Sequence, residues 1–227
     1  MTEHTSRHYE MELQTLKDKI LLLGGTVEEM IASAMKSLLG RDSELARRVI
    51  ESDEKVDAAE LEIDHLSLNL LALRQPAAVD LRFITTALKI VTDLERIGDL
   101  AVNIAERSIE LNEEPPLKPY IDIPRMASDV SGMVRQALDA FVRRDPDQAR
   151  AVLEADGAVD QLNVQLFREL LTYMIEEPKN VSRALRITFI AKYLERVGDH
   201  ATNIAQMVIF LCEGRDVRHP GAQGATG

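Results

Sequence analysis

The sequence predicts an all-α protein made of two tandem, pseudo-repeated antiparallel three-helix bundles. Its composition favours helix, because Trp is absent, aromatic residues make up only 4% of the 227 residues, and Gly and Pro are sparse. Apolar residues recur at helical spacing in long segments that Gly and Pro interrupt. The stretch LERIGDLAVNIA at 94–105 returns as LERVGDHATNIA at 194–205, with nine of twelve positions identical. A repeat of this kind indicates a duplicated helical unit.

The first half begins with a loose polar lead at residues 1–8, and a first helix is expected over about 11–39. Gly24 and Gly25 interrupt the middle of this helix. Each Gly costs about 1 kcal/mol relative to Ala in a helix interior, so the pair predicts a bend or weak point.

A second helix begins after Asp42, a natural N-cap residue, and ends near Arg74, where Pro76 breaks it. A third helix is expected over about 77–111. The segment 112–124 contains four prolines and is the only linker-like stretch in the interior. These boundaries place the first bundle at 9–114 and a Pro-rich linker at 115–124.

The second half repeats the plan, starting with a helix over 125–143. Asp145 is the N-cap of the next helix and Pro146 occupies its first position, where the missing N–H costs nothing. Pro178 ends that helix as Pro76 ends its counterpart. A last helix over about 182–212 completes a second bundle at 125–213, followed by a disordered tail at 214–227.

Charge and cysteine content exclude several classes of function. The formal net charge of −11, without a basic run, makes nucleic acid an improbable partner. The sequence likewise shows no obvious basic pocket that would bind an anionic ligand directly. The single cysteine allows neither a disulfide framework nor a thiolate metal site within one chain. No stretch approaches the roughly 20 apolar residues of a membrane span, so we expect a cytoplasmic protein that reaches a membrane only through partners.

The repeated polar residues form acidic pairs at a spacing of four. In helix two, Asp53 and Asp57 align with Asp156 and Asp160 at an offset of 103 residues. In helix three, the LER(I/V)GD stretch supplies a second pair in each half. Residues four apart lie on one helix face, one turn from each other. Each half therefore carries two acidic ladders, which Asn103 and Asn203 extend by a further turn at the periphery.

Hairpin geometry predicts that the two ladders of each half meet. Asp57 lies nineteen residues before Pro76, and Glu95 lies nineteen residues after it. In an antiparallel hairpin, residues equidistant from the turn lie at the same height. The second half repeats this arrangement to within one or two residues, about 3 Å along the axis. The sequence thus predicts two four-carboxylate clusters, the first of Asp53, Asp57, Glu95 and Asp99 and the second of Asp156, Asp160, Glu195 and Asp199.

Four carboxylates in one place repel one another, and burial makes the repulsion worse. Bound hard cations are the simplest compensation. An oxygen-only ligand set favours Fe, Mn, Mg or Ca over Zn, although Zn remains possible. The rival compensation is pairing with Arg96 and Arg196.

Other polar residues are interpreted as surface or packing residues. Glu60 and Asp64 continue the acidic strip of helix two, but the second half has Asn163 and Phe167 in their places, so we expect solvated surface there. His65 belongs to an ExxH motif that lacks the second copy a di-iron bundle needs. The same interpretation extends to two further residues: His200 is expected at the surface, and Cys212 is expected to pack rather than to react.

The duplicated DLERIGD and YLERVGDHATNIA stretches, the paired E(D)xxxD motifs and the six-helix layout resemble the PhoU family of phosphate-signalling regulators of bacteria and archaea. The resemblance covers roughly residues 11–214, and none of the eight acids departs from the family pattern. It implies two three-helix bundles side by side with multinuclear metal clusters, iron above all, on the acidic motifs. It further implies an adaptor, not an enzyme, that restrains a phosphate-sensing histidine kinase together with the ATPase of the phosphate ABC transporter. We also expect a homodimer.

Two alternatives remain open from the residues. One is an iron-binding helical-bundle oxidase or storage protein, which would consume dioxygen when loaded with iron. The other is a metal-free helical scaffold whose acids form salt bridges.

Overall fold

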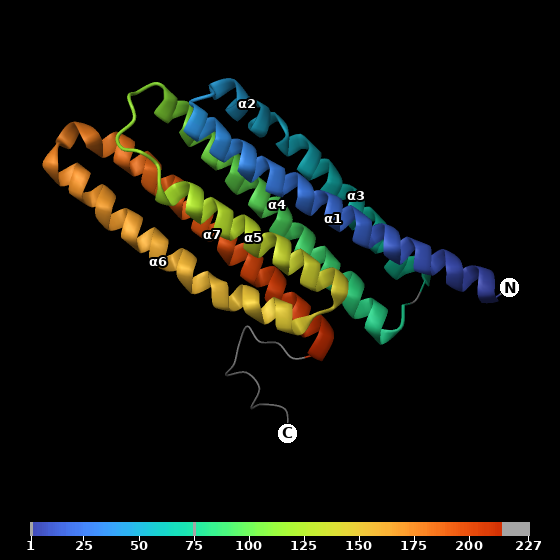
Figure 1. The fold of residues 1–227 in the computed structure, drawn as a ribbon. Helices are drawn as coiled ribbons and strands as arrows, with labels where there is room; N and C mark the ends of the chain where they lie inside the picture. Colours follow the sequence, from blue (N-terminus) through green and yellow to red (C-terminus); the bar gives the residue numbers. More distant parts are fainter. Residues whose placement is uncertain (1, 75, 215–227) are drawn as a thin grey trace.

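The computed structural model describes residues 2–74 and 76–214, and these form helices throughout (Figure 1). The all-α prediction is confirmed, and the described ranges contain no strand. The elements are α1 (Thr2–Gly40), α2 (Ser43–Glu51), α3 (Asp53–Arg74), α4 (Ala78–Asn112), α5 (Asp122–Arg143), α6 (Pro146–Glu176), the 3₁₀ turn η1 (Pro178–Asn180) and α7 (Val181–Glu213).

The two halves pack into one continuous apolar core. Helices α4 and α7 run antiparallel against each other at the centre, α1 packs on α4, and α5 packs on α7 (Figure 1). Helices α3 and α6 lie on opposite flanks, each against the long central helix of its own half. Helices α1 and α5 also touch, and Phe83 of the first half stacks on Phe141 of the second with ring centroids 5.2 Å apart.

The first helix is longer and straighter than predicted. It begins at Thr2, so residues 2–8 are helical rather than a loose lead, and it runs through Gly24 and Gly25 without interruption. A Cβ atom at Gly24 would lie only 2.2 Å from Cδ1 of Leu138 on α5, whereas one at Gly25 would meet nothing within 4 Å. Gly24 is therefore required by the close approach of α1 and α5 rather than by a bend.

The predicted second helix is two helices, α2 and α3, separated at Ser52. The Ser52 hydroxyl donates to the Val49 carbonyl at 2.7 Å, and its backbone N–H bonds to the carbonyls of Arg48 and Val49. A serine side chain that bonds to nearby backbone competes with the regular helix ladder. The second half has Ala155 at the equivalent position, and α6 is continuous there.

The predicted helix starts are close to those observed. Asp42 caps α2 by accepting from the Leu45 amide at 2.9 Å, and Asp145 caps α6 by accepting from the amides of Asp147 and Gln148 at 3.0 Å. Helix α5 starts three residues earlier than expected and includes Pro124 in its first turn, where an N–H is not needed. Gly214 ends α7 with φ of +69°; the rest of the predicted disordered tail, 215–227, lies outside the described residues.

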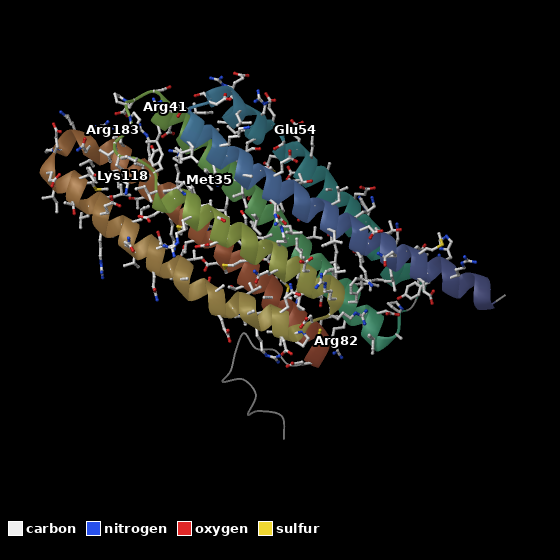
Figure 2. All side chains as sticks on the ribbon, viewed as in Figure 1. Met35, Arg41, Glu54, Arg82, Lys118 and Arg183 are labelled. Carbon is white, nitrogen blue, oxygen red and sulfur yellow. The ribbon has the colours of Figure 1, made fainter. Side chains whose placement is uncertain are left out.

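The segment between α4 and α5 is held by cations from both halves. Arg41 donates from Nη2 to the carbonyls of Asn112 and Glu114 at 2.6 and 2.7 Å. Arg183 donates to the Pro115 carbonyl at 2.8 Å, and the buried Lys118 pairs with Glu169 of α6. Figure 2 shows Arg41, Lys118 and Arg183 at the end of the molecule where this segment passes. The linker is thus part of the packed structure.

Candidate metal centres

The first acidic cluster forms where α3 crosses α4 at Gly98. A Cβ atom at Gly98 would lie 3.2 Å from Cγ1 of Val56 and 3.7 Å from Oδ1 of Asp53. The missing side chain therefore lets α3 come close, and it brings Asp53 to the turn of α4 that carries Glu95 and Asp99. The glycine of the repeated motif serves the approach of the two helices.

The second cluster has the same construction at Gly198. A Cβ atom there would lie 3.5 Å from Oδ1 of Asp156 and 3.7 Å from Cγ1 of Val159, the residue equivalent to Val56. Asp156 on α6 thus reaches the turn of α7 between Glu195 and Asp199. The structure brings the same positions together in both halves.

The pKa values show that the members of each cluster influence one another. Burial, followed by the charges of Asp57 and Asp99, raises the pKa of Asp53 above its usual range. Burial and then Asp99 raise the pKa of Glu95, although the neighbouring Arg96 opposes this. The first quartet is therefore electrostatically coupled across α3 and α4.

In the second quartet, burial and then the charges of Asp160, Asp199 and Glu195 raise the pKa of Asp156. Burial and then Glu195 raise the pKa of Asp199. Asp57 is the exposed member of the first quartet, whereas both Asp160 and Asp199 are exposed in the second.

One carboxylate oxygen in each half is buried without a hydrogen bond. These atoms are Oε2 of Glu95 and Oε2 of Glu195, on side chains that are only 16% and 13% exposed. Each lies within ion-pair distance of a cation, Arg96 Nε at 3.3 Å and Lys192 Nζ respectively, but the angles do not allow a hydrogen bond. The Glu195 oxygen is compensated by the charge of Lys192 and the Glu95 oxygen partly by that of Arg96, and a bound cation is a suitable further partner for either oxygen.

The residues fit a hard cation in kind, but their side chains are not gathered around one point. Within the described ranges, no three His, Cys, Asp or Glu side chains stand close enough together to hold a single ion. Binding of a single ion by three of these residues therefore requires side-chain rotation, for which the exposed Asp57, Asp160 and Asp199 have the most freedom. The metal assignment of all eight acids stays a prediction.

The rival prediction was that arginines, rather than metal ions, neutralise the carboxylates of each cluster. The two halves differ in this respect. Arg96 pairs with Asp99 at 2.9 Å and with Glu95 at 3.3 Å. In the second half, Lys192 pairs with Glu195, and Arg196 takes part in no ion pair within the described part of the chain. The equivalent of Lys192 is Thr92, so the repeats neutralise their clusters with different residues.

Glu60 was misassigned from the sequence as solvated surface. It is half-buried on α3, and burial followed by the charges of Asp64 and Asp57 raises its pKa. Its charge in turn raises the pKa of Glu95, so it belongs to the electrostatic field of the first cluster. Glu60 lies about one helical turn after Asp57, and this spacing could have indicated its role. The second half has Asn163 at the equivalent position, which led to the surface assignment.

The surface assignment of His200 is also wrong. Its Nδ1 lies 2.7 Å from Oδ1 of Asp93 on α4, and the two side chains are 17% and 15% exposed. Asn203 donates to the same Asp93 oxygen at 3.2 Å, whereas Asn103 donates within its own helix to the Asp99 carbonyl at 2.8 Å. The two asparagines thus have different partners, and their role as peripheral ligands remains untested.

The other two residues singled out behave as expected. His65 is exposed on α3. Cys212 is half-buried against the core, and burial raises the pKa of its thiol, which is unfavourable for a nucleophile.

The fold and the paired clusters define a duplicated helical-bundle protein with one carboxylate-rich site in each repeat. The chain matches the PhoU domain family twice, over residues 20–108 and 123–208. It therefore belongs to the PhoU family, whose members are regulatory accessory proteins and not enzymes. The resemblance seen in the sequence is confirmed.

Related proteins match over nearly their whole length. The phosphate-specific transport system accessory protein PhoU homolog of Pseudomonas putida is 43% identical over 227 residues, all of this chain and 89% of that protein. The homolog of the same description in Aquifex aeolicus is 44% identical over 92% of this chain and 94% of its own.

Two solved structures share the fold. The crystal structure of PhoU from Pseudomonas aeruginosa has a TM-score of 0.88 at 43% identity, covering 91% of this chain and 100% of that one. The phosphate transport system regulatory protein PhoU from Streptococcus pneumoniae has a TM-score of 0.85 at 26% identity, covering 92% and 99% of the two chains. Among the described helices, none combines the length and the apolar character that crossing a bilayer requires.

Proposed function

We propose that this protein regulates phosphate uptake and the phosphate-starvation response as an adaptor. In this role it couples the ATPase of a phosphate ABC transporter to a sensor histidine kinase and restrains both when phosphate is plentiful. The observation that carries the proposal is the match of both repeats to the PhoU family, with all eight acids of the motifs in place. The names of its relatives, accessory and regulatory proteins of phosphate transport, support the same role.

The proposed site of action is the cytoplasm, including the inner face of the membrane when the partners are bound. Deleting the gene should derepress a phosphate-starvation reporter in phosphate-rich medium. Pull-down of the transporter ATPase and of the cytoplasmic part of the kinase should each recover the protein. Normal repression in the deletion strain, together with no recovery by either bait, would refute the adaptor role.

Each acidic cluster is proposed to hold hard metal ions. The first candidate is a multinuclear iron cluster, and Mn, Mg, Ca or Zn are the alternatives. Oε2 of Glu95 and of Glu195 are the anchors, because each is buried without a hydrogen bond. The aspartates around them would complete the ligand set. A bound cation supplies positive charge that relieves carboxylate repulsion and ties α3 to α4, or α6 to α7.

Elemental analysis of protein purified without a His tag tests the metal proposal. Asp57→Asn with Asp99→Asn should remove metal from the first half only, and Asp160→Asn with Asp199→Asn from the second half only. Glu54→Gln is a control, because Glu54 is exposed on α3 and its counterpart is Gly157. Helical content should remain unchanged in all three variants. Fewer than one bound transition metal per wild-type chain would favour a metal-free scaffold.

The expected homodimer is proposed to form through an apolar face of α6 and α7. Three pairs of large side chains face solvent at matching heights on either side of η1: Ile175 with Val181, Leu171 with Leu185, and Phe167 with Phe189. Their exposed fractions run from 37% to 75%. The first half has Asp64, Thr85 and Lys89 where this face has Phe167, Leu185 and Phe189. The corresponding face of the first repeat also exposes apolar side chains, Leu61, Leu68 and Leu81, but it is interrupted by these polar residues.

A second copy is the occupant that fits this face. With the neighbouring Val164, this face exposes seven large apolar side chains. A group of exposed apolar side chains on adjacent helices usually marks an interaction site. Sedimentation of the purified chain tests the dimer directly, and a monomer at micromolar concentration would refute it.

A further inference from the structure

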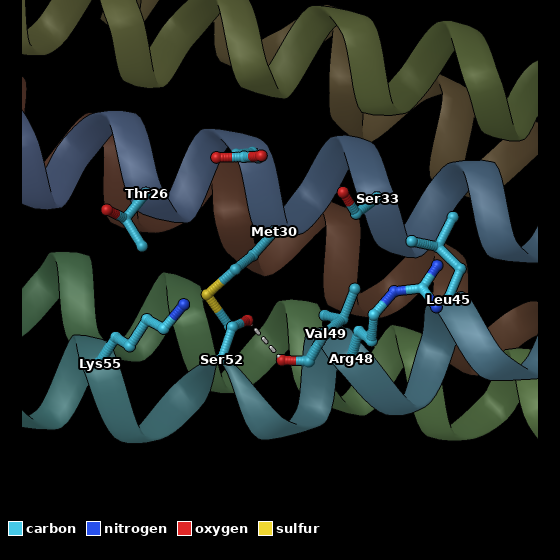
Figure 3. A pocket seen from close by; sticks show the side chains of 9 residues that line it. Thr26, Met30, Ser33, Leu45, Arg48, Val49, Ser52 and Lys55 are labelled. Carbon is cyan, nitrogen blue, oxygen red and sulfur yellow. Dashed lines mark hydrogen bonds between the residues drawn. The ribbon is translucent and has the colours of Figure 1, made fainter.

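A cavity of about 250 Å³ lies between α1 and the α2–α3 break in the first half (Figure 3). Its walls combine two cations, three hydroxyls, one carboxylate and an apolar floor. The lining residues are Thr26, Glu29, Met30 and Ser33 of α1, Leu45, Arg48 and Val49 of α2, Ser52 at the break, and Lys55 of α3. The volume is below the roughly 300–1,000 Å³ of pockets for drug-sized ligands, so it suits a small ligand.

The two cations lie on one side of the cavity and are available to a ligand. Figure 3 shows the side chains of Arg48 and Lys55 extending from α2 and α3 toward α1, on either side of Met30. They are seven residues apart, about 10.5 Å along a helix axis, and both have long flexible stems that can turn toward a ligand between them. Neither forms an ion pair with any residue that the structure describes. With Glu29 as the one carboxylate among the lining residues, two cations face one anion in a chain whose net charge is −11.

The second repeat provides an internal comparison, because its equivalent positions have lost this chemistry. At the offset of 103, Arg48, Ser52 and Lys55 correspond to Ala151, Ala155 and Ala158. On the other wall, Glu29 corresponds to Gly132. The buried residues around the two places remain alike, with Met30 matching Met133 and Val49 matching Val152. The polar residues of the cavity are therefore not needed for the fold of a repeat.

We propose that this cavity binds inorganic phosphate. A guanidinium, an ammonium and hydroxyl groups are the donors that tetrahedral oxyanions require. The carboxylate of Glu29 can only accept hydrogen bonds, so it repels a fully deprotonated anion such as sulfate. Hydrogen phosphate carries one P–OH, which can donate to that carboxylate. The site therefore selects phosphate over sulfate.

The cavity was invisible in the sequence because three helices contribute to it and no basic run marks it. The assignment stands without the adaptor role or the metal clusters. It has a structural connection to them, because Ser52 directly precedes Asp53, the first acid of the first cluster. A phosphate held at the break would order the end of α2 next to that cluster.

Isothermal titration of the full-length, chelator-treated protein with phosphate and with sulfate tests the assignment. The wild type should bind phosphate at least about tenfold more tightly than sulfate, a difference near 1.4 kcal/mol. The double variant Arg48→Ala with Lys55→Ala introduces the alanines that the second repeat has at these positions. It should bind phosphate at least about tenfold more weakly than the wild type. Arg47→Ala is the matched control, because Arg47 neighbours the site on α2 but pairs with Glu44 outside it, and it should bind phosphate normally.

Two further arms identify the ligand and the role of Glu29. The Glu29→Gln variant should bind sulfate more tightly than the wild type does. The ratio of its affinity for phosphate to its affinity for sulfate should therefore fall. Asp57→Asn with Asp99→Asn should bind phosphate like the wild type, which separates this cavity from anion binding through cluster metals. Phosphate binding that survives Arg48→Ala with Lys55→Ala, or no wild-type binding at millimolar phosphate, would overturn the assignment. Tighter binding of phosphoserine than of phosphate would also overturn it, in favour of a phosphorylated partner.

Discussion

Nδ1 of His200 on α7 lies 2.7 Å from Oδ1 of Asp93 on α4, and this contact joins the two halves of the chain between their acidic clusters. Asp93 precedes Glu95 of the first cluster by two residues, and His200 directly follows Asp199 of the second. The equivalent positions on the other side of the pseudo-repeat are Tyr193 and Leu100, which cannot form such a contact. Asp93 therefore links the two clusters through its contacts with His200 and Asn203, and no symmetric counterpart of the histidine contact exists.

A double-mutant cycle with Asp93→Asn and His200→Gln should reveal a coupling of about 1–2 kcal/mol in the free energy of unfolding. The reason is that both side chains are mostly buried and their hydrogen bond involves a charged carboxylate. Urea denaturation of chelator-treated protein measures it. Additive effects of the two single substitutions would show that the contact contributes nothing.

The adjacent glycines of α1 should respond in opposite ways to alanine. Gly25→Ala should stabilise the protein by up to about 1 kcal/mol, because the helix gains propensity and the new Cβ meets nothing. Gly24→Ala should destabilise it by about 1 kcal/mol or more, because its Cβ would overlap the buried Leu138. For a chain of this size these changes correspond to roughly 2–4 °C each in Tm. Equal shifts in the same direction would contradict the close packing of α1 on α5.

Glu95→Gln should stabilise the metal-free protein at pH 7, because it removes a carboxylate whose charged form burial and Asp99 disfavour. Burial raises the pKa of Glu95 above its ordinary value of 4.5, so between that value and the raised one the folded chain holds more protons than the unfolded chain. The contribution of this carboxyl to stability is therefore fully present below pH 4.5 and is lost as the pH rises through the raised pKa.

Denaturation of wild type and variant between pH 4 and 8 checks this prediction, and their difference should grow with pH. Taking the difference cancels other groups, such as Glu12, whose pKa Arg74 lowers. Asp156→Asn provides the comparable variant in the second half, because burial raises the pKa of Asp156 as well. With saturating metal the order should reverse, since the wild type then gains binding free energy that the variant has lost. A difference that does not vary with pH would show that Glu95 is solvated in solution.

Leu185→Thr with Phe189→Lys should convert the proposed dimer to a monomer. These substitutions install the residues of the first repeat, Thr85 and Lys89, and both positions are more than 40% exposed, so folding should be unaffected. Analytical ultracentrifugation measures the change, with circular dichroism as the control for folding. A variant that stays dimeric would place the interface elsewhere.

The sequence was sufficient for the fold class and for most of the helices, whereas the joint metal binding of the acids stays a prediction. Apolar periodicity and caps such as Asp145 located the helices, and the distances of Asp57 and Glu95 from Pro76 predicted which carboxylates approach each other. The periodicity and the caps are local in the sequence, and the distances from Pro76 follow from the geometry of one hairpin. The contacts between halves were missed, because nothing in the local pattern of His200 or Gly24 reveals that Asp93 or Leu138 lies opposite. The break at Ser52 was missed because a single hydroxyl produces it.

The shared core of α4 and α7 has a consequence for how the protein can be divided. A chain cut in the linker would leave each repeat with the inner side of its long helix bare, including the apolar residues that now meet the other repeat. The two PhoU domains are therefore repeats in sequence but not separable modules. Loosening of either repeat, whether by mutation or by loss of a ligand, would be transmitted directly to the fold of the other.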